Sequence, residues 1–138
     1  MKTIAIMIGI QGSGKSTFCR QMLSGFVRIN LDTLKTRNRE QQLLNDCIAA
    51  EQNIVIDNTN PTKADRARYI AAAKENGYRV IGYFMQSKLR KCIARNDLRE
   101  GKAKIPATAI AATSNKLEMP SINEGLMNCI LSQTTEKQ

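Results

Sequence analysis

A glycine-rich stretch near the start of the chain, GIQGSGKST at residues 9–17, has the composition and spacing of a phosphate-binding loop. It matches G-x-x-x-x-G-K-[ST] in full. Glycines let backbone N–H groups approach a phosphate that a side chain would block. The lysine of this pattern bridges the β- and γ-phosphates of a nucleotide, and the next hydroxyl holds a magnesium ion. We therefore expect ATP with Mg²⁺, with Ser16 as metal ligand, bound by Gly9, Gly12, Ser13, Gly14, Lys15, Ser16 and Thr17.

Two carboxylates, Asp32 and Asp57, follow short apolar runs and could serve the group that receives the phosphate. Ligands of a doubly wound sheet sit outside the carboxyl ends of its strands, so both are expected near the phosphate loop. Because the chain contains no histidine, Asp32 is our candidate general base for a hydroxyl acceptor. Its alternative role is a helix N-cap. Asp57 could touch the magnesium shell or grip the acceptor, and Asn58 and Asn60 beside it could simply shape the loop.

Basic residues are concentrated at residues 63–104 and account for most of the formal charge of +9. Five of them have the spacing of one helix face: Lys88, Lys91, Arg95, Arg99 and Lys102. Such a stripe is either a solvated face or a path for a polyanion such as nucleic acid. In phosphoryl-transfer enzymes a mobile segment that carries arginine closes over the γ-phosphate. We therefore expect a small basic lid at about residues 95–106.

The elements that must position these residues follow from the alternation of β-branched runs with helical periodicity. This pattern predicts an α/β fold in which helices flank a parallel sheet of four or five strands. Strands are expected at 3–9, 26–30, 53–57, 79–85 and 125–132, and helices at 15–24, 39–52, 61–76 and 87–100. Pro61 is expected as a first helical residue, Thr62 and Asp65 as a capping box, and Gly25 as the stop of the first helix.

The composition narrows the class of protein. A chain of 138 residues, of which 42% are hydrophobic, fits a single domain covering residues 1–138. Four widely separated cysteines and the lack of histidine exclude a Cys/His zinc site and favour free thiols in a reducing compartment. No apolar run approaches the roughly 20 residues of a membrane span. We expect a cytoplasmic protein without a membrane partner.

Several segments together resemble the kinase domain of polynucleotide 5′-hydroxyl kinases, both phage-type enzymes and animal polynucleotide kinase-phosphatases. The segments are GIQGSGKSTF, INLDTLK, VIDNTNPTKADRARYI, ARNDLREGKAKIP and EMPSINEGLMNCIL, which span nearly the whole chain. Many families share the phosphate loop, whereas DNTNP followed by R-x-R-Y is much more specific. The resemblance implies a P-loop kinase fold and transfer of the γ-phosphate of ATP to the 5′-hydroxyl end of DNA or RNA. No attached phosphatase or ligase domain is expected, so we expect a stand-alone kinase.

The resemblance also implies roles for individual residues. Lys15 and Ser16 would hold the donor phosphates and the metal, and Asp32 would be the general base. Arg99, supported by Arg95 at the nucleotide, would act on the transferring phosphate. The family pattern places Lys35, Asp57 and Thr59 near the acceptor, and the basic stripe adds Lys88 and Lys91 as residues expected to bind it.

The chain departs from the family pattern at Leu31 and Lys35. The family usually has arginine where Leu31 stands, and phage-type members have arginine where Lys35 stands. Lysine does not reproduce the bidentate grip of arginine on a phosphate. Arg37 or Arg39 could compensate for the second difference.

Other functions are compatible with a phosphate loop. A small-molecule kinase for a sugar, nucleoside or antibiotic has no need of an extended basic surface. A binding module that closes on ATP without transferring phosphate has no need of an acid beside an arginine lid. Toxin-type kinases of nucleotide sugars normally have longer chains. The sequence leaves open the choice between DNA and RNA and the oligomeric state.

Overall fold

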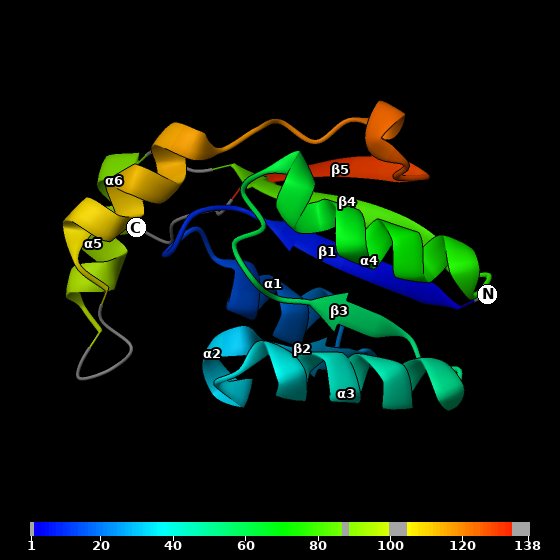
Figure 1. Ribbon diagram of the computed structural model, residues 1–138. Helices are drawn as coiled ribbons and strands as arrows, with labels where there is room; N and C mark the ends of the chain where they lie inside the picture. The colour runs from blue at the N-terminus through cyan, green and yellow to red at the C-terminus, as the bar shows by residue number, and fades with distance from the viewer. Residues whose placement is uncertain (1, 87–88, 100–104, 134–138) are drawn as a thin grey trace.

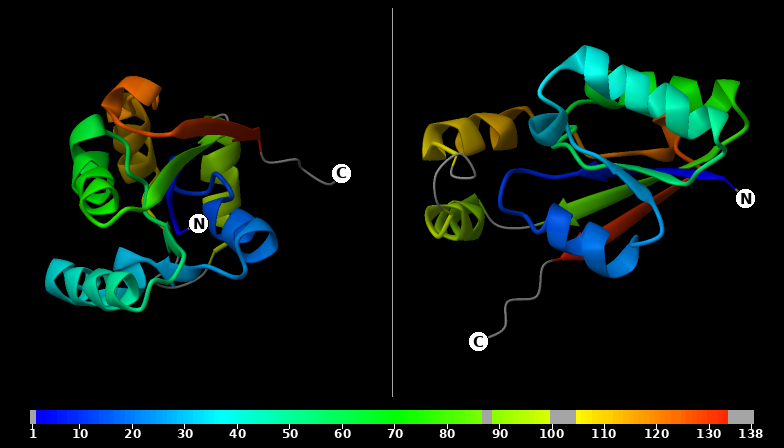
Figure 2. Two further views of the ribbon diagram at one scale, coloured as in Figure 1. Left: turned by 90° about the vertical axis from the view of Figure 1, so that its right-hand side faces the viewer. Right: turned by 90° about the horizontal axis from the view of Figure 1, so that it is seen from below.

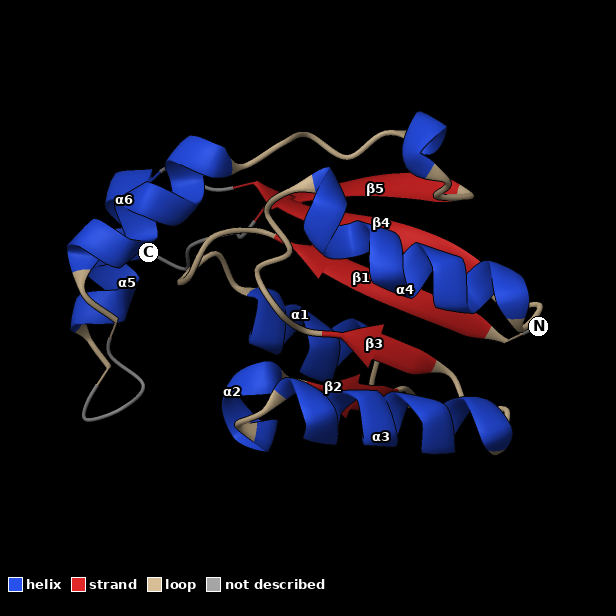
Figure 3. Cartoon of the chain, in the orientation of Figure 1, coloured by secondary structure: helices blue, strands red, loops and turns tan. Residues whose placement is uncertain are grey.

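The computed structural model describes residues 2–86, 89–99 and 105–133, which form one parallel sheet with helices on both faces (Figures 1 and 3). The strands are β1 (Thr3–Ile8), β2 (Val27–Ile29), β3 (Ile54–Ile56), β4 (Arg79–Gln86) and β5 (Asn128–Gln133). The helices are α1 (Lys15–Met22), α2 (Leu31–Leu34), α3 (Arg37–Ala49), α4 (Lys63–Glu75), α5 (Leu89–Asp97), α6 (Ala107–Lys116) and the short 3₁₀ helix η2 (Ile122–Glu124). The expected α/β fold is confirmed. Within the described residues, no helix has the length and apolarity needed to cross a membrane.

The strand order β2-β3-β1-β4-β5 puts β1 at the centre of the sheet, where it pairs in parallel with both β3 and β4. After β1, the chain forms β2 and β3 on one side of this strand and then passes to its other side, where it forms β4 and β5. Open sheets of this kind bind ligands outside the carboxyl ends of the strands, where the direction of winding reverses. The loop that follows β1 lies at that position.

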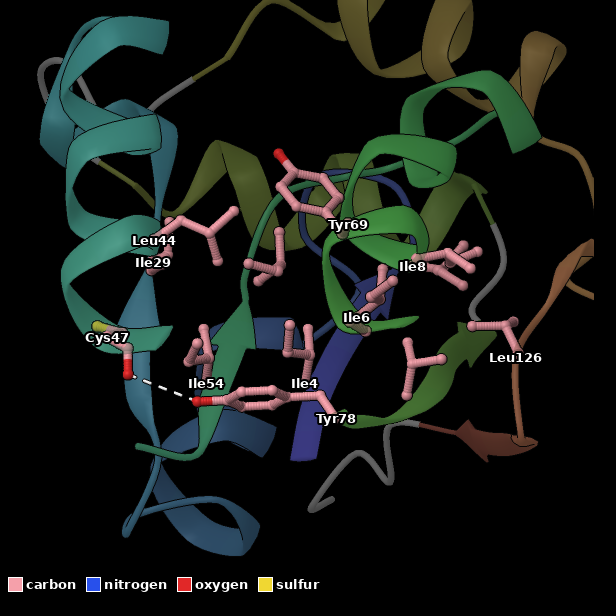
Figure 4. Close-up of a cluster of buried hydrophobic side chains, with 14 of the residues drawn as sticks. Ile4, Ile6, Ile8, Ile29, Leu44, Cys47, Ile54, Tyr69, Tyr78 and Leu126 are labelled. Atoms are coloured by element: carbon pink, nitrogen blue, oxygen red, sulfur yellow. Dashed lines mark hydrogen bonds between the residues drawn. The ribbon is translucent and has the colours of Figure 1, made fainter. Parts of the chain in front are cut away.

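The side chains of β1 divide between two hydrophobic cores because successive side chains of a strand point to opposite faces. Ile4, Ile6 and Ile8 belong to the larger core, together with residues of α3 and α4 (Figure 4). Ala5 and Met7 pack with residues of α1 in the smaller core. Figure 2 shows α1 on one face of the sheet and α3 with α4 on the other. A strand covered on both faces is almost wholly apolar, as the sequence of β1 predicted.

Side-chain caps define the starts of α3 and α4. Thr62 and Asp65 form the predicted capping box, and Thr62 is the N-cap of α4. Pro61 therefore precedes the helix and is not its first residue. At α3, the Thr36 hydroxyl accepts a hydrogen bond from the backbone N–H of Arg39, which starts this helix slightly earlier than expected.

The end of α1 and two further helices differ from the expectations. The predicted stop at Gly25 is wrong, because α1 ends at Met22 and the backbone N–H of Leu23 caps it. The helices α2 and α6 were not predicted. Helix α6 packs on α5 around a small core that includes Cys92 and Ile110, and the pair stands beyond the carboxyl ends of the strands (Figure 1). Part of the expected lid, residues 100–104, lies outside the described residues.

Candidate active site

The loop between β1 and α1 needs glycine where its backbone has a positive φ angle. Gly12 has φ +79°, and a Cβ atom at this residue would lie 2.5 Å from the carbonyl oxygen of Cys92 in α5. Gly14 has φ 95° and is the N-cap of α1. Glycine adopts these conformations without the strain that a Cβ atom causes. The loop therefore delivers the chain directly to the N-terminus of α1, where free backbone N–H groups favour an anion.

Lys15 is the first residue of α1, and its Nζ donates a 2.8 Å hydrogen bond to the carbonyl oxygen of Ile10. The pKa of Lys15 is lowered from 10.5 to about 8, chiefly because the side chain is buried. The Asp57 carboxylate opposes this decrease, and the positive charge of Arg99 adds to it. The ammonium group thus lies back over the loop in a partly desolvated position. An anionic phosphate at this position would favour its charged form.

Ser16, Asp57 and Arg28 form a closed polar triangle beside the loop. The Ser16 hydroxyl donates to Asp57 Oδ2 at 3.0 Å. Arg28 Nε donates to the same carboxylate oxygen at 2.6 Å, and Arg28 Nη2 donates to Ser16 Oγ at 3.1 Å. The Asp57 side chain is only 1% exposed, whereas that of Arg28 is 40% exposed. Arg28 of β2 and Asp57 after β3 therefore form an ion pair that contacts Ser16, the predicted metal ligand.

Ser16 and Asp57 have the chemistry needed to hold Mg²⁺ together with a nucleotide. This ion takes oxygen ligands and is usually bound by one or two carboxylates, substrate phosphates and waters. Among the residues that the structure describes, no three or more His, Cys, Asp or Glu side chains are grouped so that they could hold a metal ion. Of the two roles open for Asp57, its contact with Ser16 favours the magnesium shell, and an acceptor-binding role stays a prediction.

Asp32 is an exposed residue in the first turn of α2. The N-cap of this helix is Asn30, whose Oδ1 accepts a 3.0 Å hydrogen bond from the backbone N–H of Thr33. The alternative role of Asp32 as an N-cap is therefore wrong. Asn30 Nδ2 also donates to the carbonyl oxygen of Asp57 at 2.6 Å, which ties the turn that carries Asp32 to the end of β3. Its role as general base stays a prediction.

A buried polar network holds this acceptor-side turn. Asn58 Oδ1 accepts from the backbone N–H of Leu31 at 2.9 Å, and Asn58 Nδ2 donates to Glu40 Oε2 at 2.9 Å. Glu40 is fully buried, and its Oε1 accepts from the Tyr69 hydroxyl at 3.0 Å and from Arg37 Nη1 at 2.9 Å. Helices α3 and α4 thus position α2 through one carboxylate.

Thr59 and Asn60 connect the segment after β3 to the phosphate loop and β1. The carbonyl oxygen of Thr59 accepts a 3.0 Å hydrogen bond from the backbone N–H of Gly9. Asn60, which has φ +44°, donates from Nδ2 to the carbonyl oxygen of Met7 at 2.8 Å. Asn60 therefore has the loop-shaping role that the sequence left open. The described contact of Thr59 is a main-chain contact to the donor loop, and its acceptor-binding role stays a prediction.

Helix α5 brings both predicted lid arginines toward the loop. Arg95 Nη1 donates to the carbonyl oxygen of Gly12 at 2.8 Å. Arg99 follows the end of α5, and its charge is close enough to lower the pKa of Lys15, although burial of that lysine is the larger cause. The structure therefore gathers Arg95, Arg99 and Lys15 around the phosphate loop, although they come from two distant segments.

The lysines predicted to bind the acceptor have less defined surroundings. Lys35 is exposed and caps the C-terminus of α2 with φ 77°. Lys91 is exposed on α5. Lys88 and Lys102 lie outside the described residues.

Sequence reasoning missed several polar contacts at the phosphate loop and in the helix pair beside it. Arg28 makes some of them, and its position in an otherwise apolar run of the sequence was a usable signal. Gln11 Nε2 donates to Thr113 Oγ1 in α6 at 3.2 Å, which connects the loop to a helix that was not predicted. The buried Asn96 side chain pairs with both the N–H and the carbonyl oxygen of Ile105, and thereby joins the end of α5 to the segment leading into α6.

Relatives named as polynucleotide kinases resemble the chain in sequence. A bifunctional polynucleotide phosphatase/kinase of Schizosaccharomyces pombe is 29% identical over 130 residues, which are 91% of this chain and 32% of the relative. A protein of Acanthamoeba polyphaga mimivirus, also named as a bifunctional polynucleotide phosphatase/kinase, is 39% identical over 79 residues, 56% of this chain and 19% of the relative. The resemblance noted in the sequence is confirmed. The chain spans about a third or less of the length of these relatives.

Solved structures with the same fold are more distant in sequence. A gluconokinase of Sinorhizobium meliloti 1021 is 16% identical with a TM-score of 0.65, covering 99% of this chain and 84% of the other. Kti12 of Chaetomium thermophilum, solved with ADP-AlF3, is 15% identical with a TM-score of 0.70, covering 94% and 88% of the two chains. They show a P-loop kinase fold.

The family model of the AAA domain matches residues 32–120, which is more than half of the chain. The match begins after the phosphate loop, so it is independent of the glycine-rich motif. Together with the central β1, the loop that follows it and the five-stranded parallel sheet, it shows that the chain belongs to the AAA domain family of P-loop proteins.

Proposed function

We propose that the protein transfers the γ-phosphate of ATP to the 5′-hydroxyl end of DNA or RNA. The observation that carries this proposal is the 2.6 Å hydrogen bond between Asn30 and the main chain of Asp57. This contact joins the turn that carries the candidate base to the residue that contacts Ser16, so donor and acceptor groups share one edge of the sheet. The names of the two relatives support a polynucleotide as the acceptor.

The donor half uses the loop, Lys15 and the Ser16–Asp57 pair. Backbone N–H groups at the start of α1 and the Lys15 ammonium hold the β- and γ-phosphates. Ser16 and Asp57 would hold Mg²⁺, which neutralises charge on the phosphates when it is bound. Arg99 offsets the charge that develops on the transferring group, and Arg95 keeps the end of α5 against the loop.

The acceptor half uses Asp32. Its carboxylate takes the proton of the 5′-hydroxyl while the hydroxyl oxygen forms a bond to the γ-phosphorus. The bond from that phosphorus to the β,γ-bridging oxygen breaks, and ADP leaves. Basic residues of α5, including the exposed Lys91, and the net charge of +9 favour a polyanionic acceptor.

A small-molecule kinase is the second candidate function, because the gluconokinase fold covers 99% of the chain. The polynucleotide kinase and the small-molecule kinase would use the same phosphate donor and differ only in the molecule that accepts the phosphate. A third candidate, a nucleotide-dependent binding module, predicts ATP binding without any phosphorylated product.

Transfer from γ-labelled ATP to a panel of acceptors distinguishes these functions. The panel contains 5′-hydroxyl DNA and RNA oligonucleotides, single-stranded and duplex, the same oligonucleotides with a 5′-phosphate, and a set of sugars and nucleosides. We expect labelling of the 5′-hydroxyl oligonucleotides alone. Labelling of a sugar or nucleoside in their place would establish the second candidate, and ATP binding without any labelled product would establish the third.

A further inference from the structure

Arg28 lies on the two side chains that would hold the metal. Its Nε is 2.6 Å from Asp57 Oδ2, and its Nη2 is 3.1 Å from Ser16 Oγ. Since these two oxygens are themselves 3.0 Å apart, one planar guanidinium bridges both. The polynucleotide kinase resemblance assigns no role to this residue.

A guanidinium and Mg²⁺ compete for these two oxygens. The Asp57 oxygen that faces Ser16 is already engaged by Arg28, and a divalent cation beside the guanidinium would be repelled. The hydroxyl hydrogen of Ser16 points to Asp57, and Arg28 Nη2 occupies one of the two acceptor positions of the same oxygen. Charge repulsion therefore favours the release of Arg28 from both oxygens when a metal binds.

The difference in exposure indicates which partner moves. Asp57 is buried at the end of β3 and has a 1% exposed side chain, whereas the Arg28 side chain is 40% exposed. An unpaired charge is costly in the interior but not in water. Arg28 also lines an open cavity on the α1 side of β2, with Cys19, Arg20, Leu23, Ser24, Phe26 and Val55. It can therefore leave Asp57 without disturbing the core, whereas Asp57 has to stay.

We infer that Arg28 is an internal counter-ion of Asp57 that competes with Mg²⁺ for Ser16 and Asp57 and so lowers the affinity of the protein for metal alone. This inference rests on the proposed use of Ser16 and Asp57 as metal-holding residues. ATP brings negative phosphates to the loop, and these can attract the released guanidinium and contribute the remaining metal ligands. Metal binding thereby becomes dependent on nucleotide, and Asp57 keeps a cationic partner at every stage.

The test compares Arg28→Gln with the wild type in the absence of nucleotide. In metal-free buffer Arg28→Gln should melt at a lower temperature, because Asp57 has lost its partner. Addition of Mg²⁺ alone should restore much of this loss, whereas the melting temperature of the wild type should change little. Mn²⁺ binding measured by electron paramagnetic resonance should be tighter in Arg28→Gln on the order of tenfold, the usual scale of coupling between two sites.

Further variants make the outcome specific to the proposed contact. Arg20→Gln is the matched control, because Arg20 lines the same cavity but contacts the Thr17 hydroxyl and not Asp57; it should bind Mn²⁺ like the wild type. Arg28→Lys keeps the charge but cannot bridge both oxygens, so an intermediate Mn²⁺ affinity is expected even if Arg28→Gln folds poorly. In Arg28→Gln/Asp57→Asn the gain in Mn²⁺ affinity should disappear.

Equal Mn²⁺ affinities of the wild type, Arg28→Gln and Arg28→Lys would overturn the inference, as would a gain that persists in the double variant. The labelling panel makes this failure distinguishable from failure of the proposed function. If the wild type phosphorylates a 5′-hydroxyl oligonucleotide but replacement of Arg28 does not change metal binding, the proposed function would stand and the inference about Arg28 would be rejected. If Arg28→Gln binds metal more tightly but the wild type transfers no phosphate, the inference about Arg28 would hold and the proposed function would fail.

Discussion

The positive φ angles of the phosphate loop come from glycines within the loop, and distant residues such as Thr59 and Arg95 only hold it in place. The side-chain contacts that hold the turn of Asp32 come from residues far away in the sequence. Gly12 and Gly14 supply the positive φ angles of the loop, and α1 begins directly after them. The turn depends on Asn58 after β3 and on Glu40 in α3. Damage to the buried network should therefore affect acceptor use and leave the donor half largely intact.

Loss of Lys15 should have the largest effect on transfer. Lys15→Ala removes the charge that bridges the phosphates, and transfer should fall by more than the ~10²–10³-fold typical of removing one stabilising donor, because ground-state binding is lost as well. Single-turnover transfer measures this, with Lys116→Ala in α6 as control. Wild-type rates for Lys15→Ala would contradict the proposed enzymatic function.

Asp32→Asn tests the acceptor half directly. If Asp32 is the base, transfer at saturating oligonucleotide should fall by ~10² to 10⁴ while ATP and oligonucleotide still bind. Because Asn30 is the helix cap, a loss of capping does not explain such a result. Asp46→Asn, an exposed acid of α3, is the control. A decrease below about tenfold, smaller than general-base catalysis provides, would remove Asp32 from the mechanism.

Glu40→Gln should impair the binding of the acceptor oligonucleotide without affecting the binding of the donor ATP. The amide would place N–H donors against Tyr69, Arg37 or Asn58, which all donate to this side chain. Breaking such a buried charged network costs about 3 to 5 kcal/mol of unfolding free energy. In the folded fraction, the KM for oligonucleotide should rise while the Kd for ATP stays unchanged. The exposed Glu75→Gln is the control, and equal losses of ATP and oligonucleotide binding would show that the halves are not independent.

The basic stripe should contribute to oligonucleotide binding, and this contribution should weaken as the salt concentration rises. Lys91→Gln should reduce the slope of log K for oligonucleotide against log salt by ~0.7 to 0.9 for each lost phosphate contact. The triple variant that also replaces Lys88 and Lys102 should reduce it further, whereas Arg99→Ala should lower the transfer rate more than affinity. An unchanged slope in the triple variant would make the stripe a solvated face.

A smaller effect is expected on protonation, because the binding of ATP should be accompanied by uptake of a fraction of a proton. Burial lowers the pKa of Lys15 to about 8, and bound phosphates should raise it again. ATP affinity should therefore decrease as pH rises above about 8, and calorimetry in buffers of different ionisation enthalpy should detect proton uptake there but little at pH ~7. In Lys15→Arg this uptake should vanish, because arginine stays charged; uptake that persists would assign it to another group.

The same lowered pKa makes a prediction for stability. The unfolded chain, with a lysine pKa of 10.5, binds more protons than the folded protein between about pH 8 and 10.5. The unfolding free energy contributed by Lys15 should therefore increase as pH rises through that window. Denaturant titrations of the wild type and Lys15→Met would isolate this contribution.

Features that depend on neighbouring residues were predictable. The phosphate loop follows from glycines at fixed spacing, the central strand from its continuous apolar run, and the box of Thr62 and Asp65 from the spacing of two side chains. The stop of α1 at Gly25 was not, because the helix ends earlier, where Leu23 is buried in the smaller core. Helix α6 was also missed, since packing on α5 stabilises a segment without a strong helical pattern.

By itself, the sequence of this protein determined the sheet, the phosphate loop and the presence of carboxylates after two strands, because local backbone geometry and strand periodicity need no distant partner. Only the tertiary structure decided which side chains meet. Asp57 lies on Ser16 and Arg28 because β2 and β3 are adjacent in the sheet, and Glu40 holds the turn of Asp32 because α3 and α4 cover the same face. Such contacts depend on strand order and helix placement, which a pattern of single residues does not encode.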